Sequence, residues 1–288
     1  MEIVNKISAM QAMTAELRSK QRKIAFVPTM GYLHEGHLEL MRVAKANADC
    51  LIISIFVNPA QFGENEDIDI YPRDIEGDSK KAKNVGVDIL FFPDVREIYP
   101  QGYQTKIKIT ELSQHLCGIS RPGHFDGVAT IVAKLFNIVK PHTAIFGEKD
   151  WQQLQIIRRM VTDLNMDIEI IGVPIFREPD GLALSSRNSY LSPEERVSAL
   201  CLKGALNIAK SMVVDGERKS SKILDAMTEY IVGHPFTKID YIAICDSETL
   251  HYVDAIADNP VLLALAVFIG KTRLIDNAVI TPKTNLLK

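Results

Sequence analysis

The sequence predicts an α/β protein: a parallel sheet covered by helices on both faces, followed by a smaller α+β domain. Short apolar runs alternate with stretches of helical periodicity along the first part of the chain, and strands that recur across helices need parallel crossovers. After residue 177 the pattern changes to two helical stretches and two strand-like runs. A chain of 288 residues with 47% hydrophobic side chains can bury a sizeable core. We therefore predict a first domain at residues 1–177 and a second at residues 178–288.

Each expected element follows from its local pattern. Apolar runs predict strands of the first domain at residues 23–29, 50–58, 88–93, 143–147 and 167–176. Helical spacing predicts a helix through Leu40, Met41, Ala44 and Ala48, a polar helix near residues 73–84, a helix with Val128, Ile131, Val132, Leu135, Phe136 and Val139 on one face, and another with Leu154, Ile157, Val161 and Leu164 on one face. The second domain should hold helices at residues 193–214 and 220–232 and strands at residues 238–246 and 261–270, before an unorganised end at 281–288.

Charge and composition narrow the class of protein. With 33 Lys and Arg against 36 Asp and Glu, the net charge of -3 gives no electrostatic footprint for nucleic acid or an anionic membrane. We find neither the apolar core of a signal peptide nor a run of about 18 apolar residues that could span a membrane, so a cytoplasmic protein is expected. The cysteines are far apart, without a C-x-x-C pair, which argues against a zinc site or a disulfide framework and favours buried or idle thiols: Cys50, Cys117, Cys201 and Cys245.

The stretch "PTMGYLHEGHLEL" at residues 28–40 is the first candidate site. It follows a strand and leads into a helix, with His34 and His37 three residues apart. Their spacing differs from H-E-x-x-H, and a third metal ligand is not evident. A pair of surface or capping histidines is one alternative. The position favours another interpretation, because glycines let the backbone approach a ligand, the helix N-terminus offers N–H groups to an anion, and the imidazoles can donate to phosphate oxygens. Such an arrangement of glycines, N–H groups and imidazoles suits a nucleotide triphosphate. We expect His37 to be the first residue of the helix.

Five motifs in order give the sequence a specific resemblance. "PTMGYLHEGH" is similar to the H-x-G-H signature of nucleotidylyltransferases and class I aminoacyl-tRNA synthetases. With "FVNPAQF", "RPGHFDGV", "FGEKDWQQ" and "LALSSRN" after it, the chain resembles the pantoate–β-alanine ligase family from residue 28 to residue 190. The resemblance implies a Rossmann-like first domain and a small second domain that closes over ATP. It also implies a two-step reaction in which pantoate forms a pantoyl adenylate, releasing pyrophosphate, and β-alanine then displaces AMP.

The resemblance and the chemistry of the residues together assign the nucleotide site. Lys149 lies at a strand-to-helix turn, where its ammonium can reach phosphates, although alone it could be a solvated surface charge. Two hydroxyls and a guanidinium follow one another in "SSRN" and suit several phosphate oxygens, although a serine cap beside an exposed Arg is the alternative. The resemblance implies catalytic roles for His34, His37, Lys149 and Arg187, and ATP contacts from Met30, Gly31, His34, His37, Gly147, Lys149, Asp150, Leu184, Ser185, Ser186 and Arg187. Asp150 is expected on the ribose.

Neutral amides after strands are the candidates for the acid site. Asn58, Gln61 and Gln153 can satisfy the hydroxyls and carboxylate of a small acid without burying net charge, although each could be an ordinary turn residue. The resemblance implies that Gln61 and Gln153 bind pantoate and that Gln61 also contacts β-alanine. The neighbouring Gln152 is an alternative to Gln153 for this role. Arg121 and His124 resemble a segment near the active site. Their alternatives are a surface charge beside a turn and an N-terminal helix residue.

Cofactors, partners and competing functions complete the expectations. Magnesium is expected on the ATP phosphates, held by phosphate oxygens and water, because no protein-only metal cage is visible; Asp67 and Asp69 are acidic residues that could approach it. The resemblance implies a homodimer. A related adenylate-forming or nucleotidyl-transferring enzyme for another acid is one alternative function. A non-catalytic nucleotide-binding module is another, although such a module should have lost a phosphate-binding residue.

Overall fold

Parallel strands joined by helices build the first part of the chain. The computed structural model describes residues 1–63, 66 and 68–281. Two units result from its contacts. The first unit comprises Met1–Ser113, Arg121–Glu148 and Gln153–Phe176, whereas the second comprises Gln114–Ser120, Lys149–Gln152 and the chain from Arg177 onward. Two short segments of the first part of the sequence therefore belong by their contacts to the second unit.

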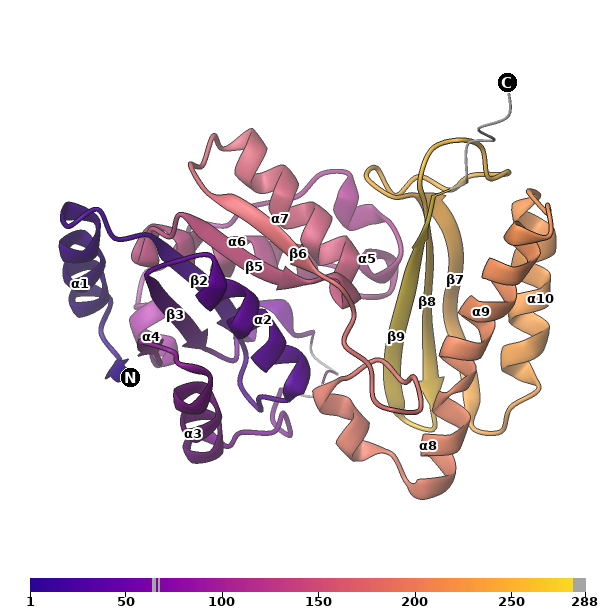
Figure 1. The fold of residues 1–288 in the computed structure, drawn as a ribbon, viewed down its shortest axis with the longest axis horizontal. Coiled ribbons are helices and arrows are strands. Elements are labelled where there is room, and N and C mark those ends of the chain that lie inside the picture. The colour runs from indigo at the N-terminus through magenta and orange to yellow at the C-terminus, as the bar shows by residue number, and fades with distance from the viewer. Residues whose placement is uncertain (64–65, 67, 282–288) are drawn as a thin grey trace. The chain divides into compact units, whose positions relative to one another are not determined.

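The first unit contains a parallel sheet of six strands in the order β1-β4-β3-β2-β5-β6. Figure 1 labels four of them, β2, β3, β5 and β6. Apolar residues occupy most strand positions, as expected for a sheet buried on both faces. The strands are β1 (Glu2–Val4), β2 (Ile24–Thr29), β3 (Cys50–Ile55), β4 (Ile89–Phe91), β5 (Thr143–Gly147) and β6 (Glu169–Val173). The predicted α/β class with a parallel sheet is confirmed.

Helices cover both faces of this sheet because successive strand residues point to opposite sides. Phe26 and Ile52 pack with α1 (Ile7–Ser19), α6 (His124–Val139) and α7 (Trp151–Asp163). The alternate residues Val27 and Ile53 pack with α2 (Glu35–Ala46) and α3 (Ile75–Val85). Shorter helices complete the connections: α4 (Val95–Ile98), α5 (Cys117–Ser120), and the 3-10 turns η1 (Pro59–Gln61), η2 (Leu112–Gln114) and η3 (Glu148–Asp150).

The second unit is a three-stranded antiparallel sheet with helices packed against it. The strand order is β7-β8-β9. Its elements are η4 (Ser186–Tyr190), α8 (Pro193–Ala199), α9 (Cys201–Val214), α10 (Ser220–Val232), β7 (Thr237–Asp246), β8 (Val261–Ile269) and β9 (Thr272–Ile280). Leu202, Leu206 and Met227 from the helices and Leu263 and Leu265 from β8 are fully or nearly fully buried in one core. The predicted α+β second region is confirmed.

Three details differ from the expectations, two in the second unit and one at the end of α7 in the first. The helix expected at residues 193–214 is interrupted at Leu200, where α8 ends and α9 begins. Leu164 lies beyond the end of α7 and is 51% exposed, so it is not part of the buried helix face. Strand β9 was not expected, because polar residues interrupt its apolar pattern. One of them, Asp276, is 2% exposed and is neutralised by Arg177, whose two terminal nitrogens donate to its carboxylate at 2.7 and 2.8 Å.

The stretch Pro193–Val214 bears on the expectation that no run of about 18 apolar residues could span a membrane. By length and composition alone it passes as a candidate span. It is two helices, however, and the apolar residues Leu202, Leu206 and Ala209 of α9 pack into the core of the second unit. The segment is accounted for as core helix. Of the final stretch 281–288, all but Thr281 lies outside the described residues.

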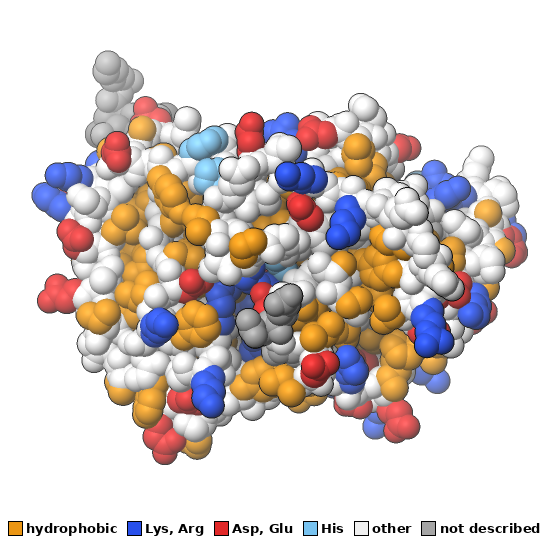
Figure 2. Space-filling model, turned by 180° about the vertical axis from the view of Figure 1, so that it is seen from behind, with side chains coloured by type: hydrophobic (Ala, Val, Ile, Leu, Met, Phe, Trp, Pro, Cys, Tyr) orange, Lys and Arg blue, Asp and Glu red, His pale blue; other side chains and the backbone are white. Residues whose placement is uncertain are grey.

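Charged side chains of both signs are interspersed over the face of the molecule drawn in Figure 2. This distribution is in keeping with the formal net charge of -3. A charged ligand therefore depends on locally placed groups rather than on the field of a whole surface.

Candidate functional site

The candidate residues of the first unit lie in segments that follow the carboxyl ends of its central strands, around β2 and β5. The chain passes from β2 to β3 and β4 on one side, and from β5 to β6 on the other. Phe26 pairs with Ala144, and this register, continued by three residues, places Gly147 level with Thr29. Ligands of such sheets bind at the point where the strand order reverses. The edge here leads into Met30–His37 after β2, the turn from Asn58 after β3, and Gly147 at the end of β5.

A tight turn carries the chain from β2 to α2. Gly31 has φ +85° and Tyr32 has φ +50°. A Cβ atom on Gly31 would lie 2.9 Å from Ile55 Cγ2, so the position requires glycine. The carboxylate of Asp78 from α3 then accepts from the backbone N–H groups of Tyr32 at 2.7 Å and Leu33 at 2.6 Å. Asp78 is 1% exposed, and this burial raises its pKa although the two backbone hydrogen bonds oppose the shift.

The two histidines lie at the start of α2. His34 is the N-cap residue and Glu35 is the first helical residue, so the expectation that His37 comes first in the helix is wrong: it is the third. The imidazole rings stack with centroids 4.0 Å apart. The backbone N–H of His34 donates to His37 Nδ1 at 3.3 Å. His37 Nδ1 is therefore an acceptor, and in the neutral ring the proton lies on Nε2, which is a donor.

Gln61, at the end of η1, is held through its side chain. Asn58 Nδ2 donates to Gln61 Oε1 at 3.0 Å and to the carbonyl of Gly127 at 3.1 Å. The Tyr99 hydroxyl donates to Asn58 Oδ1 at 2.7 Å. Gln61 Nε2 in turn lies 3.4 Å from the thioether sulfur of Met30, a weak acceptor. The amide of Gln61 is thus oriented before any ligand arrives.

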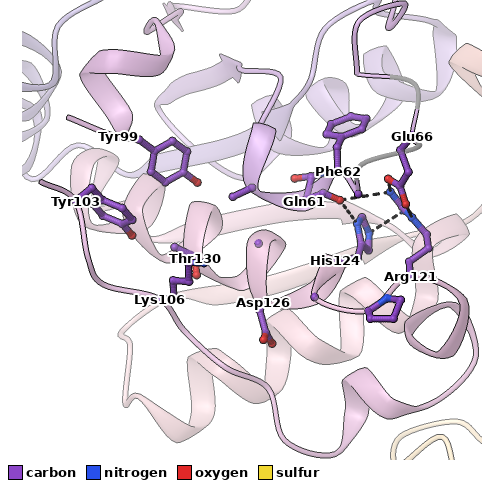
Figure 3. A pocket seen from close by; sticks show the side chains of 15 residues that line it. Gln61, Phe62, Glu66, Tyr99, Tyr103, Lys106, Arg121, His124, Asp126 and Thr130 are labelled. Carbon is purple, nitrogen blue, oxygen red and sulfur yellow. Dashed lines mark hydrogen bonds and ion pairs between the residues drawn. The ribbon is translucent and has the colours of Figure 1, made fainter. Parts of the chain in front are cut away.

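Its backbone carbonyl is held as well (Figure 3). His124 Nδ1 lies 2.8 Å from the Gln61 carbonyl, and Arg121 Nη1 lies 3.1 Å from His124 Nε2. A guanidinium only donates, so His124 Nε2 accepts and Nδ1 donates. Arg121 also pairs with Glu66, and although burial opposes it, this contact lowers the pKa of the Glu66 carboxyl. The Arg121 side chain is 17% exposed, so the alternative of a surface charge is wrong. His124 is the first residue of α6, which agrees with the alternative of an N-terminal helix residue.

A pocket of about 260 Å³ opens beside this network within the first unit (Figure 3). Aromatic and charged side chains share its wall, among them Phe62, Tyr99, Tyr103, Lys106 and Asp126. Gly127 brings α6 against η1, because a Cβ at that position would collide with the carbonyl of Ala60. Helix α6 and the turn that carries Gln61 therefore form one close-packed body.

The two neighbouring glutamines of α7 differ clearly. The amide of Gln152, 6% exposed, accepts from the backbone N–H of Cys117 at 3.0 Å and donates to the carbonyl of His115 at 2.7 Å. Gln153 is half-buried, and its side chain makes no hydrogen bond to the described residues. Gln152 thus has a local structural partner, and Gln153 is the one available to a ligand.

Lys149 and Asp150 belong to the second unit. Asn277 of β9 donates from Nδ2 to the carbonyl of Lys149 at 2.9 Å, and the indole N–H of Trp151 donates to the carbonyl of Ser247 at 2.7 Å. The first bond holds the backbone of η3 at Lys149, and the second holds the side chain of Trp151 at the start of α7. The ammonium of Lys149 forms no ion pair with any residue that the structure describes, and Asp150 is exposed.

The segment from Leu184 to Arg187 opens η4 in the same unit. The hydroxyl of Ser185 accepts from the backbone N–H of Arg187 at 3.3 Å, so Ser185 does act as a cap, as its alternative interpretation expected. Asn188 fixes the following turn by donating to Glu178 at 2.7 Å and to the carbonyl of Ala183 at 3.2 Å. Cap and ligand contacts are compatible, because a hydroxyl that accepts from the backbone can still donate its proton.

Burial disfavours the reactive thiolate form at three of the four cysteines. Cys50, Cys201 and Cys245 are buried, and burial raises their pKa values to about 11, about 12 and about 12. All four cysteines are free; three are buried, as expected, whereas Cys117 is half-buried. Within the described ranges no group of three His, Cys, Asp or Glu side chains could hold a metal ion. Asp67 lies outside these ranges, and Asp69 is exposed.

Sequence reasoning missed the residues that support the site. Asp78 stands on the same face of α3 as the buried Ala82, and a carboxylate on a buried face needs a partner, which was the available signal. Tyr99 and Glu66 gave no such signal, since each lies in an irregular stretch and meets its partner only through the fold.

In this Rossmann-like sheet, β2 leads through a glycine turn into a helix that carries the H-x-G-H motif. This combination defines a nucleotide-binding α/β enzyme. A family model described as Pantoate-beta-alanine ligase matches residues 2–279. The pantothenate synthetase of Syntrophus aciditrophicus (strain SB) is 55% identical over 286 residues, which are 99% of this chain and 100% of that protein. The chain therefore belongs to the pantoate-beta-alanine ligase family, as the order of its motifs indicated.

Solved structures agree with this assignment. The crystal structure of pantothenate synthetase from Thermus thermophilus matches with a TM-score of 0.92 at 43% identity, covering 98% of this chain and 100% of that one. The pantoate-beta-alanine ligase of Francisella tularensis, complexed with Beta-gamma ATP and Beta-alanine, matches with a TM-score of 0.77 at 34% identity over 97% of both chains. Both the fold class and the family resemblance are confirmed.

Proposed function

We propose that this ligase joins pantoate to β-alanine in two steps at the carboxyl edge between β2 and β5. In the first step a carboxylate oxygen of pantoate bonds to the α-phosphorus of ATP, and the bond to pyrophosphate breaks. In the second step the β-alanine amine bonds to the acyl carbon, and AMP leaves. The observation that carries the proposal is the H-x-G-H turn at the point where the strand order reverses, beside the prearranged amide of Gln61.

The first unit would supply the pocket for the adenylate and part of the charge stabilisation. A carboxylate is ionised near neutral pH, so the attack needs no general base. It needs donors where negative charge develops on the leaving pyrophosphate. His37 Nε2 and the neighbouring His34, which lie at the N-terminus of α2, would be such donors. Met30, Gly31 and Gly147 would shape the adenylate pocket through their backbone.

The second unit would supply the remaining cations. We propose that Lys149 and Arg187 bind phosphate oxygens with Ser185 and Ser186, that Leu184 makes a backbone contact, and that Asp150 binds the ribose. The support is the ammonium of Lys149, which has no ion-pair partner among the described residues and stands on a backbone fixed by Asn277. In this proposal residues 1–177 form the ATP- and pantoate-binding domain and residues 178–288 form the lid, with the Lys149 segment grouped with the lid by its contacts.

The acid would be bound by amides. Gln61 and Gln153 are proposed to meet the hydroxyls and carboxylate of pantoate, with Gln61 also near β-alanine. Gln153 is available for this because Gln152, beside it, is already occupied by the turn at His115–Cys117. All donors and acceptors of the Asn58 amide are used within the protein, which favours support of Gln61 over a direct contact of Asn58 with the acid.

Magnesium, homodimer formation and a cytoplasmic location are further parts of this proposal. The ion would be held chiefly by phosphate oxygens and water, since Mg²⁺ keeps its hydration readily. When bound, the ion would neutralise part of the phosphate charge. The protein's own donors would orient the phosphate groups. In this proposal neither step needs a protein cage for the ion.

Pyrophosphate–ATP exchange tests the proposed route. The purified protein should exchange labelled pyrophosphate into ATP with pantoate and magnesium present and β-alanine absent, and omission of pantoate should abolish the exchange. Exchange with a different acid, and none with pantoate, would point to a related adenylate-forming enzyme. ATP binding without pyrophosphate exchange, whichever acid is supplied as substrate, would point to a non-catalytic nucleotide-binding module. A Lys149→Ala variant serves as the chemical control.

A further inference from the structure

Gln61 lies at the end of a chain of hydrogen bonds that begins at Tyr99. The Tyr99 hydroxyl contacts Asn58 at 2.7 Å, and Asn58 contacts Gln61 at 3.0 Å. All three residues lie in the first unit. None of these contacts involves the turn at residues 30–37 directly, yet they determine which end of the Gln61 amide faces Met30.

The orientation of the Asn58 amide is fixed by its backbone neighbours. The N–H of Ala60 donates to Asn58 Oδ1 at 3.3 Å, and the carbonyl of Gly127 accepts from Asn58 Nδ2 at 3.1 Å. A backbone N–H only donates and a carbonyl only accepts, so the oxygen and nitrogen ends cannot be exchanged. Asn58 is also 1% exposed, so no water can replace a lost partner easily.

This orientation passes to Gln61. The second N–H of Asn58 Nδ2 donates to Gln61 and therefore demands the oxygen end of that amide. Gln61 Nε2 must then point to Met30, where its nearest partner is a thioether sulfur at 3.4 Å. Sulfur is a weak acceptor, so an oxygen of a bound acid would take the N–H in preference.

Tyr99 completes the acceptor side of Asn58. Burial raises the pKa of its phenol, so the hydroxyl keeps its proton throughout the neutral range and remains a donor. Together the phenol and the Ala60 N–H occupy both lone pairs of Asn58 Oδ1. Without the phenol, the Asn58 side chain keeps its place less firmly, and Gln61 gains freedom to turn its oxygen toward the ligand.

We propose that Tyr99 and Asn58 are positioning residues that set Gln61 as a donor, so that the acid is recognised through an oxygen that accepts from Gln61 Nε2. This inference rests on the proposed function of Gln61 in acid binding. It adds that Tyr99 acts on the acid only through Gln61.

A double-mutant cycle tests the proposal. Tyr99→Phe keeps the ring and removes the hydroxyl. We expect it to raise the KM for pantoate in the exchange reaction about three- to tenfold, the range for one lost hydrogen bond, with kcat and the KM for ATP changed less than about twofold. Combined with Gln61→Ala, it should add less than about twofold, because its route to the acid is already gone.

Tyr103→Phe is the matched control. Its ring lies 5.1 Å from that of Tyr99 and borders the same pocket, but its hydroxyl makes no hydrogen bond to the described residues. It should leave both KM values unchanged. Equal effects of Tyr99→Phe with and without Gln61, or equal increases in both KM values, would overturn the proposal.

A spectroscopic readout separates this inference from the proposed function. If the wild type shows no pantoate-dependent exchange, the function assignment fails, and side-chain amide NMR decides the positioning role by itself. Tyr99→Phe should shift the side-chain NH₂ signals of Gln61, identified by their loss in Gln61→Ala, whereas Tyr103→Phe should not. Unchanged Gln61 signals in Tyr99→Phe would overturn the proposal whatever the activity.

Discussion

The two units prepare their candidate residues in different ways. In the first unit, Gln61 is held through both its amide and its carbonyl, and the turn before His34 is held by Asp78. For Lys149 in the second unit, the structure holds the backbone through Asn277, while the ammonium has no ion-pair partner among the described residues. A neutral group can be prearranged by protein contacts at small expense, whereas a cation with a protein partner would have to give it up to bind phosphate. The difference suggests that the ligand itself supplies the partner of Lys149.

The largest expected effect comes from Lys149, whose ammonium has no ion-pair partner within the part of the chain that the structure describes. Lys149→Ala should lower the rate of pyrophosphate–ATP exchange by about 10²–10³-fold, since it removes a donor from developing charge. Thermal stability should hardly change, because the side chain makes no ion pair with the described residues that could be lost. Lys238→Ala, at an exposed position of β7, is the control. Near-wild-type exchange in Lys149→Ala would show that the cationic half of the site is misplaced.

His37 should come next. His37→Ala removes the Nε2 donor at the start of α2 and should lower exchange by about 10²-fold. It also removes the acceptor of the His34 N–H, so a modest loss of stability is expected. Rate measurements beside thermal unfolding separate the two effects, with His251→Ala at an exposed position as control. A loss of stability without a loss of rate would assign His37 to capping alone.

Asp78 offers a sharper test of prearrangement. Asp78→Asn leaves one acceptor for two N–H groups, so we expect kcat/KM for ATP to fall about tenfold as the turn loosens.

The sign of its stability effect follows from its pKa. Burial raises the folded-state pKa of Asp78 above 3.8, so folding favours the protonated carboxyl. The stability that this group contributes to the folded state is therefore present in acid and is lost as the pH rises through the raised pKa. Unfolding followed against pH should therefore show wild type losing its advantage over Asp78→Asn as the pH rises. An advantage that grows with pH would mean that the backbone hydrogen bonds outweigh burial.

The smallest effect should distinguish two adjacent glutamines. Gln153→Ala is expected to raise the KM for pantoate several-fold without changing stability, about the effect of one or two hydrogen bonds. Gln152→Ala should instead lower the unfolding temperature, because two hydrogen bonds to the turn at His115–Cys117 are lost. Kinetics and unfolding on the two variants check this directly, and the reverse pattern would exchange their roles.

The sequence predicted what local chemistry and order along the chain determine. The alternation of apolar runs predicted the parallel sheet, and motif order predicted the family. It could not predict β9, whose buried Asp276 is neutralised by Arg177 from 99 positions away. Nor could it predict Tyr99 on Asn58, 41 positions apart. Residues that act through a partner distant in sequence have no local pattern to reveal them.

The close approach at Gly127 has a consequence for changing which acid the protein accepts. Helix α6 cannot acquire a side chain at that point without displacing the turn that carries Gln61. The hydrogen-bonding pattern of the site can therefore be altered at Gln61 itself, while its frame stays in place. Widening the site for a bulkier acid is a different problem, because helix and turn would have to be redesigned together as one piece.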